Sequence, residues 1–298
     1  MQSKKIFKRA PIPFQGQKHA WFKQFSRVIE RVKAVDPCAN VFDAFGGSGL
    51  LSYWAKHLNP SFNVIYNDFD NYSERLTHIS DVNRLLQSLR EIIQVNGHEL
   101  ARKLTAQEIE QVKHLLTSFD GYIDANCLNS WLMFTAHRAK DVSDVLRVKT
   151  QFFDRLPAEN YDENAAAEYL AGLTIIHEDA RDYEHFQTVI KPLLRKDHVT
   201  SYILDPPYLY TDKTNYKSLY FGLADTVNLL NYFTHQRHFI LFNSDASGLF
   251  ELIRELKRVF PEIDLTYEIE RRPRSLAAKS NGGLVKGEEY ALWRCQEK

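Results

Sequence analysis

The stretch VFDAFGGSG at residues 41–49 decides the fold class of this chain of 298 residues. Its first five residues are mostly apolar and aromatic, which is typical of a buried strand, and glycines end that strand. Apolar residues then recur at helical spacing until Asn59-Pro60 stops the helix. A buried strand that leads through glycines into a helix begins an alternating α/β pattern.

The same alternation continues further along the chain. Buried strands are expected at 63–69, 174–179, 201–205 and 238–243, with helices between the later strands at about 181–191, 225–235 and 247–259. Strands that alternate with helices predict a parallel sheet covered on both faces. Residues 263–270 and 289–295 have the pattern of two strands without a helix between them, so the edge of the sheet should turn antiparallel.

Residues 71–172 interrupt this rhythm, because they show only helical patterns. A strand-helix-strand step needs about 30 residues, so this stretch is too long for one connection. We therefore expect two domains: an α/β domain formed by 1–70 and 173–298, and a helical insertion at 71–172 with a role other than building the sheet.

Composition and cysteine content limit the class of protein. Hydrophobic residues make up 44% and charged residues 26% of the chain, as in ordinary soluble globular proteins. No apolar run approaches the ~18–20 residues that span a bilayer, and the N-terminus lacks the apolar core of a secretory signal. Three scattered cysteines without a CxxC pair exclude a disulfide framework and suit a reducing cytosol, and the histidines show no metal-ligand spacing. We expect a cytoplasmic protein without a membrane or metal partner.

Charge is balanced overall but unevenly distributed. The chain has 38 basic and 38 acidic residues, so its net charge gives no reason to expect a nucleic-acid partner. Residues 1–29 nevertheless contain seven basic and no acidic residues, and no acid lies between Glu270 and Glu288. Each run is either ordinary solvated surface or one border of a groove that binds phosphates.

Two features at strand ends suit a nucleotide-like ligand. Phe45, Gly47 and Gly49 lie at the first strand-to-helix turn, where glycines let a ligand approach the backbone and the helix N-terminus offers N–H groups. Asp68 ends the second strand, about 20 residues later, where an acid can accept both ribose hydroxyls of an adenosine-containing cofactor. The alternatives are plain turn geometry for the glycines and helix capping for Asp68.

The sharpest motif is Asp205-Pro206-Pro207-Tyr208, directly after an apolar strand. Two prolines fix φ and donate no hydrogen bonds, so the Asp205 carboxylate and the Pro206 carbonyl are held rigidly at the edge of the sheet. Two adjacent acceptors suit both hydrogens of an exocyclic amine, and Tyr208 offers a face for base stacking, worth ~1–3 kcal/mol. The alternative is an ordinary strand end with Tyr208 in the core.

Together these motifs resemble those of S-adenosylmethionine-dependent amino-methyltransferases. The segment PFQGQK at 13–18 is similar to the N-terminal cofactor segment of the Dam-like DNA adenine-N6 methyltransferases, although Gln17 stands where that family usually has a second glycine. The segment 205–216 looks most like phage and prophage members. The resemblance implies a cofactor site made of Phe14, Lys18, Phe45, Gly47, Gly49, Asp68, Asp179 and Asp205. It implies a catalytic motif made of Asp205, Pro206, Pro207 and Tyr208.

The resemblance further implies a Rossmann-like methyltransferase fold, with a mostly parallel mixed sheet, a C-terminal antiparallel hairpin and a helical insertion. The expected activity is transfer of a methyl group from S-adenosylmethionine to adenine N6 in double-stranded DNA after base flipping. The insertion at 71–172 corresponds by position to the family's target-recognition region. Alternatives are an enzyme of the same fold that acts on RNA adenine or a protein amide, and an inactive DNA-binding relative.

Basic clusters supply the candidates for DNA contact. The insertion has 11 basic and 15 acidic residues, an unusual balance for a DNA-reading domain. The DNA-contact candidates are Arg138, Lys140, Arg147 and Lys149 within it, and Arg271, Arg272, Arg274 and Lys279 near the C-terminus. For the cluster in the insertion, an ordinary solvated helix face is the alternative.

Overall fold

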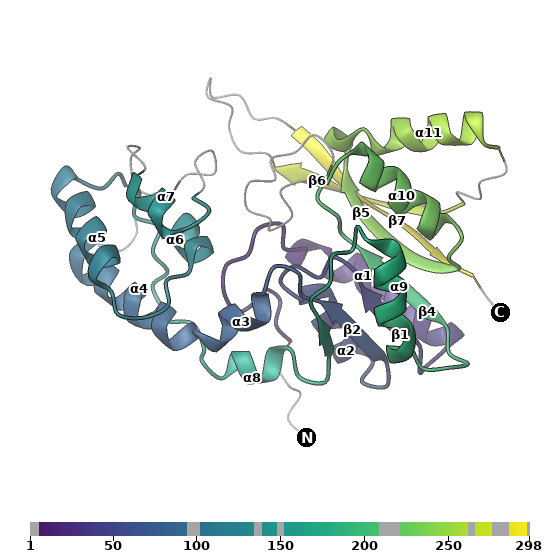
Figure 1. Cartoon of the computed structure of the whole chain (residues 1–298), viewed down its shortest axis with the longest axis horizontal. Helices are drawn as coiled ribbons and strands as arrows, with labels where there is room; N and C mark the ends of the chain where they lie inside the picture. Colours follow the sequence, from purple (N-terminus) through teal and green to yellow (C-terminus); the bar gives the residue numbers. More distant parts are fainter. Residues whose placement is uncertain are drawn as a thin grey trace. The chain divides into compact units, whose positions relative to one another are not determined.

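The computed structural model (Figure 1) forms two compact units, which we call the helical unit and the sheet unit. The helical unit comprises Met1–Gln17 and Asn71–Ala171, and the sheet unit comprises Lys18–Asp70 and Gly172–Lys298. The structure describes residues 6–93, 102–133, 139–147, 152–208, 221–261, 266–275 and 286–296. Within these ranges, no helix combines the length and the apolar character needed to cross a bilayer.

A seven-stranded sheet in the order β3-β2-β1-β4-β5-β7-β6 forms the centre of the sheet unit. Its strands are β1 (Asn40–Asp43), β2 (Asn63–Asn67), β3 (Thr174–Ile176), β4 (Thr200–Leu204), β5 (His238–Ser244), β6 (Glu268–Ser275) and β7 (Lys286–Cys295). The first five strands pair in parallel, whereas β7 is antiparallel to both β5 and β6. This confirms the expected Rossmann-like methyltransferase fold with a C-terminal antiparallel hairpin.

Helices cover both faces of this sheet because its central strands are apolar on both sides. The helices of the unit are α1 (Phe22–Val35), α2 (Leu50–Leu58), α9 (Tyr183–Ile190), α10 (Leu223–Thr234) and α11 (Leu249–Val259), with short 3-10 turns η1 (His19–Trp21), η2 (Lys191–Leu193) and η3 (Asp245–Ser247). Phe42, Tyr202 and Leu241 pack in one buried cluster with residues of α9, α10 and α11. Helices α1 and α2 contribute nothing to that cluster and pack on each other and on β1, β2 and β7, so they cover the opposite face.

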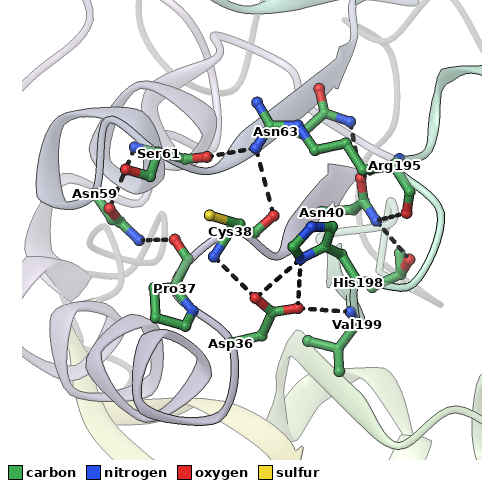
Figure 2. Close-up of polar contacts among 11 residues, drawn as sticks. Asp36, Pro37, Cys38, Asn40, Asn59, Ser61, Asn63, Arg195, His198 and Val199 are labelled. Atoms are coloured by element: carbon green, nitrogen blue, oxygen red, sulfur yellow. Dashed lines mark hydrogen bonds and ion pairs between the residues drawn. The ribbon is translucent and has the colours of Figure 1, made fainter.

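A polar network closes the edge of the sheet at which β1, β2 and β4 begin (Figure 2). The buried Asp36 carboxylate accepts hydrogen bonds from the backbone N–H groups of Cys38 and Val199 and lies 3.0 Å from Nδ1 of His198. The Asn40 amide bonds both the N–H and the carbonyl of Arg195. Burial raises the pKa of Asp36, but these hydrogen bonds outweigh it and hold the pKa below its ordinary value. The network therefore fixes the register of the strands before they reach their carboxyl ends.

Six helices build the described part of the helical unit. They are α3 (Tyr72–Thr77), α4 (Ile79–Ile93), α5 (Ala106–Ser118), α6 (Ala125–Leu132), α7 (Val142–Arg147) and α8 (Ala165–Tyr169). Apolar residues recur three and four positions apart along α4, where Val82, Leu86 and Leu89 are buried. A capping box between Thr105 and Glu108 begins α5.

The division of the chain differs from the expected one at the N-terminus. We placed residues 1–17 in the α/β domain, whereas the structure groups them with the helical unit. The Tyr72 hydroxyl accepts from the Ile12 N–H at 3.1 Å and donates to the Ile12 carbonyl at 3.0 Å, and Arg75 donates to the Pro13 carbonyl at 2.7 Å. Three long-range hydrogen bonds, two of them buried, therefore hold this segment on α3, and no local sequence pattern predicts them.

The penultimate strand is also displaced from its expected position. We placed it at 263–270, whereas β6 spans Glu268–Ser275 and residues 262–265 lie outside the described part. Arg271 and Arg272 therefore belong to a strand rather than to a loop, and they pair in register with Tyr290 and Glu289. Charged side chains are compatible with this position because β6 is the edge strand of the sheet.

Candidate functional site

The candidate site lies where β1, β2 and β4 end, at the carboxyl edge of the parallel sheet. Ligands of open α/β sheets bind at this edge. The glycine turn follows β1, Asp68 follows β2, and the Asp205-Pro206-Pro207-Tyr208 motif follows β4. Since β1 pairs with both β2 and β4, the fold brings these three predicted features to adjacent strands.

The glycine turn has the backbone geometry that a ligand cradle requires. Gly47 and Gly49 adopt positive φ values of 51° and 70°, which favour glycine, and Gly49 is the N-cap of α2. A Cβ atom on Gly46 would lie 2.2 Å from Cδ2 of Tyr66. Gly46 and Gly47 are partly exposed although the strand before them is buried. The backbone of this turn is thus open to a ligand at the N-terminus of a helix, where anionic groups are stabilised.

Tyr66 joins the turn to Asp68. Its hydroxyl lies 2.7 Å from the Gly47 carbonyl oxygen and 3.0 Å from Oδ1 of Asp68. Asp68 is fully buried, and its main chain bonds Ile176 and the His177 ring. Our sequence analysis missed Tyr66, although the two-residue period of a strand places it on the same face as Asp68.

Asp43 is a second buried acid that the sequence analysis missed. It ends β1 and accepts from the Ser52 hydroxyl at 2.7 Å, and the backbone N–H groups of Phe45 and Ser52 also bond it. Burial raises the pKa of Asp43 to about 7, and the nearby Asp205 charge raises it as well. The sequence did contain a signal for Asp43, because this acid stands at the end of a buried strand and close to the glycines that follow.

The Asp205 carboxylate forms an ion pair with Lys18. The Lys18 Nζ lies 2.5 Å from Oδ2 of Asp205, and the two side chains are only 8% and 17% exposed. The Tyr208 hydroxyl lies 3.5 Å from the other oxygen, Oδ1. Lys18 and Asp205 are therefore in direct contact, although they lie 187 positions apart in the sequence. The assignment of Lys18 to the cofactor stays a prediction.

Trp21 and Glu289 extend this cluster and were missed by the sequence analysis. The Trp21 indole N–H donates to Oε2 of Glu289 at 3.1 Å, and its ring packs against Phe242. Burial raises the pKa of Asp205, Lys18 lowers it, and the Glu289 charge raises it. The balance leaves the pKa of Asp205 above its ordinary value. No sequence pattern connects Glu289 in β7 with this site.

Asp179 has a local partner in the structure. Arg181 binds its carboxylate through both Nε and Nη2, and this hydrogen bonding lowers the pKa of Asp179. The preceding residue, Glu178, is tied to the end of β2 because the Asn67 amide bonds both its N–H and its carbonyl. The same amide donates to the Ala44 carbonyl, so Asn67 connects three segments of the site. The contact of Asp179 with a cofactor stays a prediction.

Phe14 belongs to the helical unit, where its ring packs edge-on against Tyr72. Its predicted contact with the cofactor is untested by this arrangement. Among the DNA-contact candidates, Arg138, Lys149 and Lys279 lie outside the described residues, and Arg274 is described only as part of β6. Lys140 and Arg147 are exposed, and Arg271 binds Glu288 at 2.9 Å. DNA contact by these residues stays a prediction.

Comparison with known proteins identifies the family. The sequence matches no model of a known protein family. It is 38% identical over 262 residues to a Haemophilus influenzae (strain Rd) protein named "Putative methyltransferase", and the match covers 86% of this chain and 81% of that protein. The chain belongs to this methyltransferase family. Methyl-group transfer is thus the coarse function of this protein.

A solved structure also aligns with this methyltransferase. It is precorrin-6y C5,15-methyltransferase from Geobacter metallireducens GS-15, which is 8% identical and covers 91% of this chain and 88% of its own. The TM-score of 0.32 is too low for this likeness to carry an argument. The fold assignment therefore depends on the strand order and pairing described above.

Proposed function

We propose that this methyltransferase is a Dam-like enzyme that transfers the methyl group of S-adenosylmethionine to adenine N6 in double-stranded DNA. One observation carries the proposal: the Asp205-Pro206-Pro207-Tyr208 motif begins at the residue after β4, and the largely buried Asp205 carboxylate follows a strand that pairs with β1, the strand before the glycine turn. The Asp205 carboxylate and the Pro206 carbonyl are a pair of acceptors that suits an amine substrate. The glycine turn on the adjacent strand suits a cofactor that contains adenosine.

The residues at the ends of β1 and β2 fit the cofactor. The open turn at Gly46 and Gly47 admits a ligand to the backbone, and the N-terminus of α2 favours a negatively charged group. Asp68 supplies a carboxylate acceptor beside that turn, through Tyr66. When bound, S-adenosylmethionine supplies a methyl group that is already electrophilic. The residues of the sheet unit that would hold it are Phe45, Gly47, Gly49, Asp68 and Asp179.

Asp205 and Pro206 activate the amine in this account. The N6 lone pair of adenine is delocalised into the ring, which makes the amine a poor nucleophile. Hydrogen bonds from the amine to the Asp205 carboxylate and the Pro206 carbonyl favour a lone pair localised on nitrogen. The same acceptors stabilise the positive charge that develops on N6 in the transition state. Proline at 206 and 207 restricts the backbone, so the two acceptors keep one orientation.

Recognition of a duplex requires that the target base leave the helix, because N6 cannot reach a buried carboxylate while the base is stacked. Tyr208 is partly buried and has its hydroxyl near Asp205, so its ring is a suitable surface for the flipped base. In this proposal the helical unit contacts the flanking DNA. Among the described residues, Lys140 and Arg147 supply exposed positive charge for that purpose.

A substrate panel tests the proposed function. Purified protein is incubated with labelled S-adenosylmethionine and, in parallel, duplex DNA, ribosomal RNA or a glutamine-containing peptide. We expect N6-methyladenine in duplex DNA, identified by nucleoside mass spectrometry. Transfer to RNA or to the amide would replace DNA as the substrate class. Cofactor binding without transfer to any of the three would identify an inactive relative.

A further inference from the structure

The Asp205 carboxylate lies among four other titratable side chains. Lys18 binds Oδ2, and the Tyr208 hydroxyl is near Oδ1. The Glu289 charge raises the pKa of Asp205, and the Asp205 charge raises the pKa of Asp43. Lys18 thus places a cation against a largely buried carboxylate that has two neighbouring acids. Burial without a counter-charge would favour the protonated form of Asp205.

We propose that Lys18 is a positioning residue for catalysis, which holds Asp205 charged through Oδ2 and leaves Oδ1 to accept the substrate amine. This inference deepens the proposed function and depends on it for the identity of the amine. The role is distinct from contact with the cofactor, because it acts through the 2.5 Å ion pair to Asp205. A neutral Asp205 would carry a hydroxyl donor on one oxygen and only an uncharged, weaker acceptor on the other, so it would hold the amine hydrogens less strongly.

The surroundings of Lys18 support a fixed geometry. Lys18 precedes η1, and its carbonyl accepts from the Trp21 N–H at 2.8 Å. Its ammonium lies 5.5 Å from the ring centre of Tyr208 and 5.8 Å from that of Phe242. Trp21 packs against the same Phe242 and binds Glu289. The short turn η1 and the residue before it therefore position two groups. Lys18 stabilises the Asp205 charge, and Trp21 orients Glu289, the acid whose charge opposes that of Asp205.

Kinetics of Lys18→Met and Lys18→Arg test this role, with Lys23→Met on the exposed side of α1 as the matched control. At pH values on the acid limb of the kcat–pH profile, where kcat rises with pH, we expect kcat of Lys18→Met to fall by up to ~10-fold, because this limb moves upward by about one pH unit. KM for S-adenosylmethionine should change less than about threefold, since the role is exerted in the chemical step. Lys18→Arg should restore the acid limb, and Lys23→Met should match the wild type. An unmoved acid limb with a raised KM would overturn the proposal in favour of a cofactor contact.

A substrate-free measurement separates this inference from the proposed function. Asp205 has a folded-state pKa above its unfolded value, so the stability associated with its protonated form is lost as pH rises through the folded pKa. Removal of Lys18 moves that pKa further upward. The Tm of Lys18→Met relative to wild type should therefore fall as pH rises above the folded-state pKa of Asp205 in the wild type, and the double variant Lys18→Met/Asp205→Asn should lose this trend. If Tm depends on pH in the same way in wild type and in both variants, the Lys18–Asp205 coupling is refuted, even if no DNA is methylated.

Discussion

Gly46 and Tyr66 approach so closely that no side chain larger than hydrogen fits between them. A Cβ atom on Gly46 would lie 2.2 Å from Cδ2 and 2.3 Å from Cε2 of the Tyr66 ring. The ring is buried, and its hydroxyl is fixed by Gly47 and Asp68, so it has little freedom to move away. The shape of the glycine turn therefore depends on this contact.

Gly46→Ala should destabilise the protein by ~1–3 kcal/mol, because the added methyl group overpacks the turn. It should also weaken binding of S-adenosylmethionine, since the turn must shift. Urea unfolding and calorimetric titration measure the two effects. Gly222→Ala is the matched control, because the atom nearest to its Cβ is 3.7 Å away. Unfolding midpoints that coincide for the two variants would contradict the steric account.

Tyr66→Phe removes a hydroxyl that bonds both the turn and Asp68, so we expect a loss of ~1–2 kcal/mol and weaker cofactor binding. Tyr161→Phe removes the hydroxyl that accepts from the Trp131 indole in the helical unit. It should lower stability in a similar way and leave cofactor affinity unchanged. If both variants bind the cofactor like wild type, Tyr66 does not organise the site.

Asp43→Asn tests the buried acid at the end of β1. With a folded-state pKa of about 7, Asp43 is protonated in the folded protein at a pH where the unfolded chain is ionised. Its contribution to stability is full below about pH 4 and is lost as pH rises to about 7, at up to ~1.4 kcal/mol per pH unit. The unfolding free energy of Asp43→Asn relative to wild type should thus increase from pH 4 to 7 and level off above. A pH-independent difference would show that Asp43 is ionised in the folded state.

Glu289→Gln should have the opposite effect to Lys18→Met. It removes a negative charge that raises the pKa of Asp205, so the acid limb of the kcat profile should move downward. The neighbouring Glu288→Gln, whose side chain is exposed and binds Arg271, is the control and should leave the limb in place. An upward displacement in Glu289→Gln would contradict the arrangement of charges around Asp205.

Local patterns sufficed to predict much of the fold and to mark three features that the fold brings to the ends of adjacent strands. Apolar runs located the strands, and glycine or proline next to them marked the carboxyl ends where Asp68 and Asp205 lie. The strand order follows from pairing that such patterns do not specify. The displaced strand β6 illustrates this, because its register is set by pairing with β7 and not by its own apolar content.

Residues that reach the site through long-range contacts could not be predicted. Lys18 meets Asp205 across 187 positions, and Trp21 meets Glu289 across 268. Such contacts depend on how η1 and β7 are placed by the rest of the sheet unit. Motif resemblance suggested Lys18 for another reason and gave no indication of Glu289.

The most direct test of the central claim is methylation of unmodified genomic DNA by wild type and Asp205→Ala, read by nucleoside mass spectrometry and methylation-aware sequencing. Urea unfolding of both proteins establishes that the variant is folded. The account predicts N6-methyladenine with wild type and at least ~100-fold less with Asp205→Ala, because the amine loses its charged acceptor. Near-wild-type methylation by folded Asp205→Ala, or no methylated adenine from wild type that binds the cofactor, would contradict it.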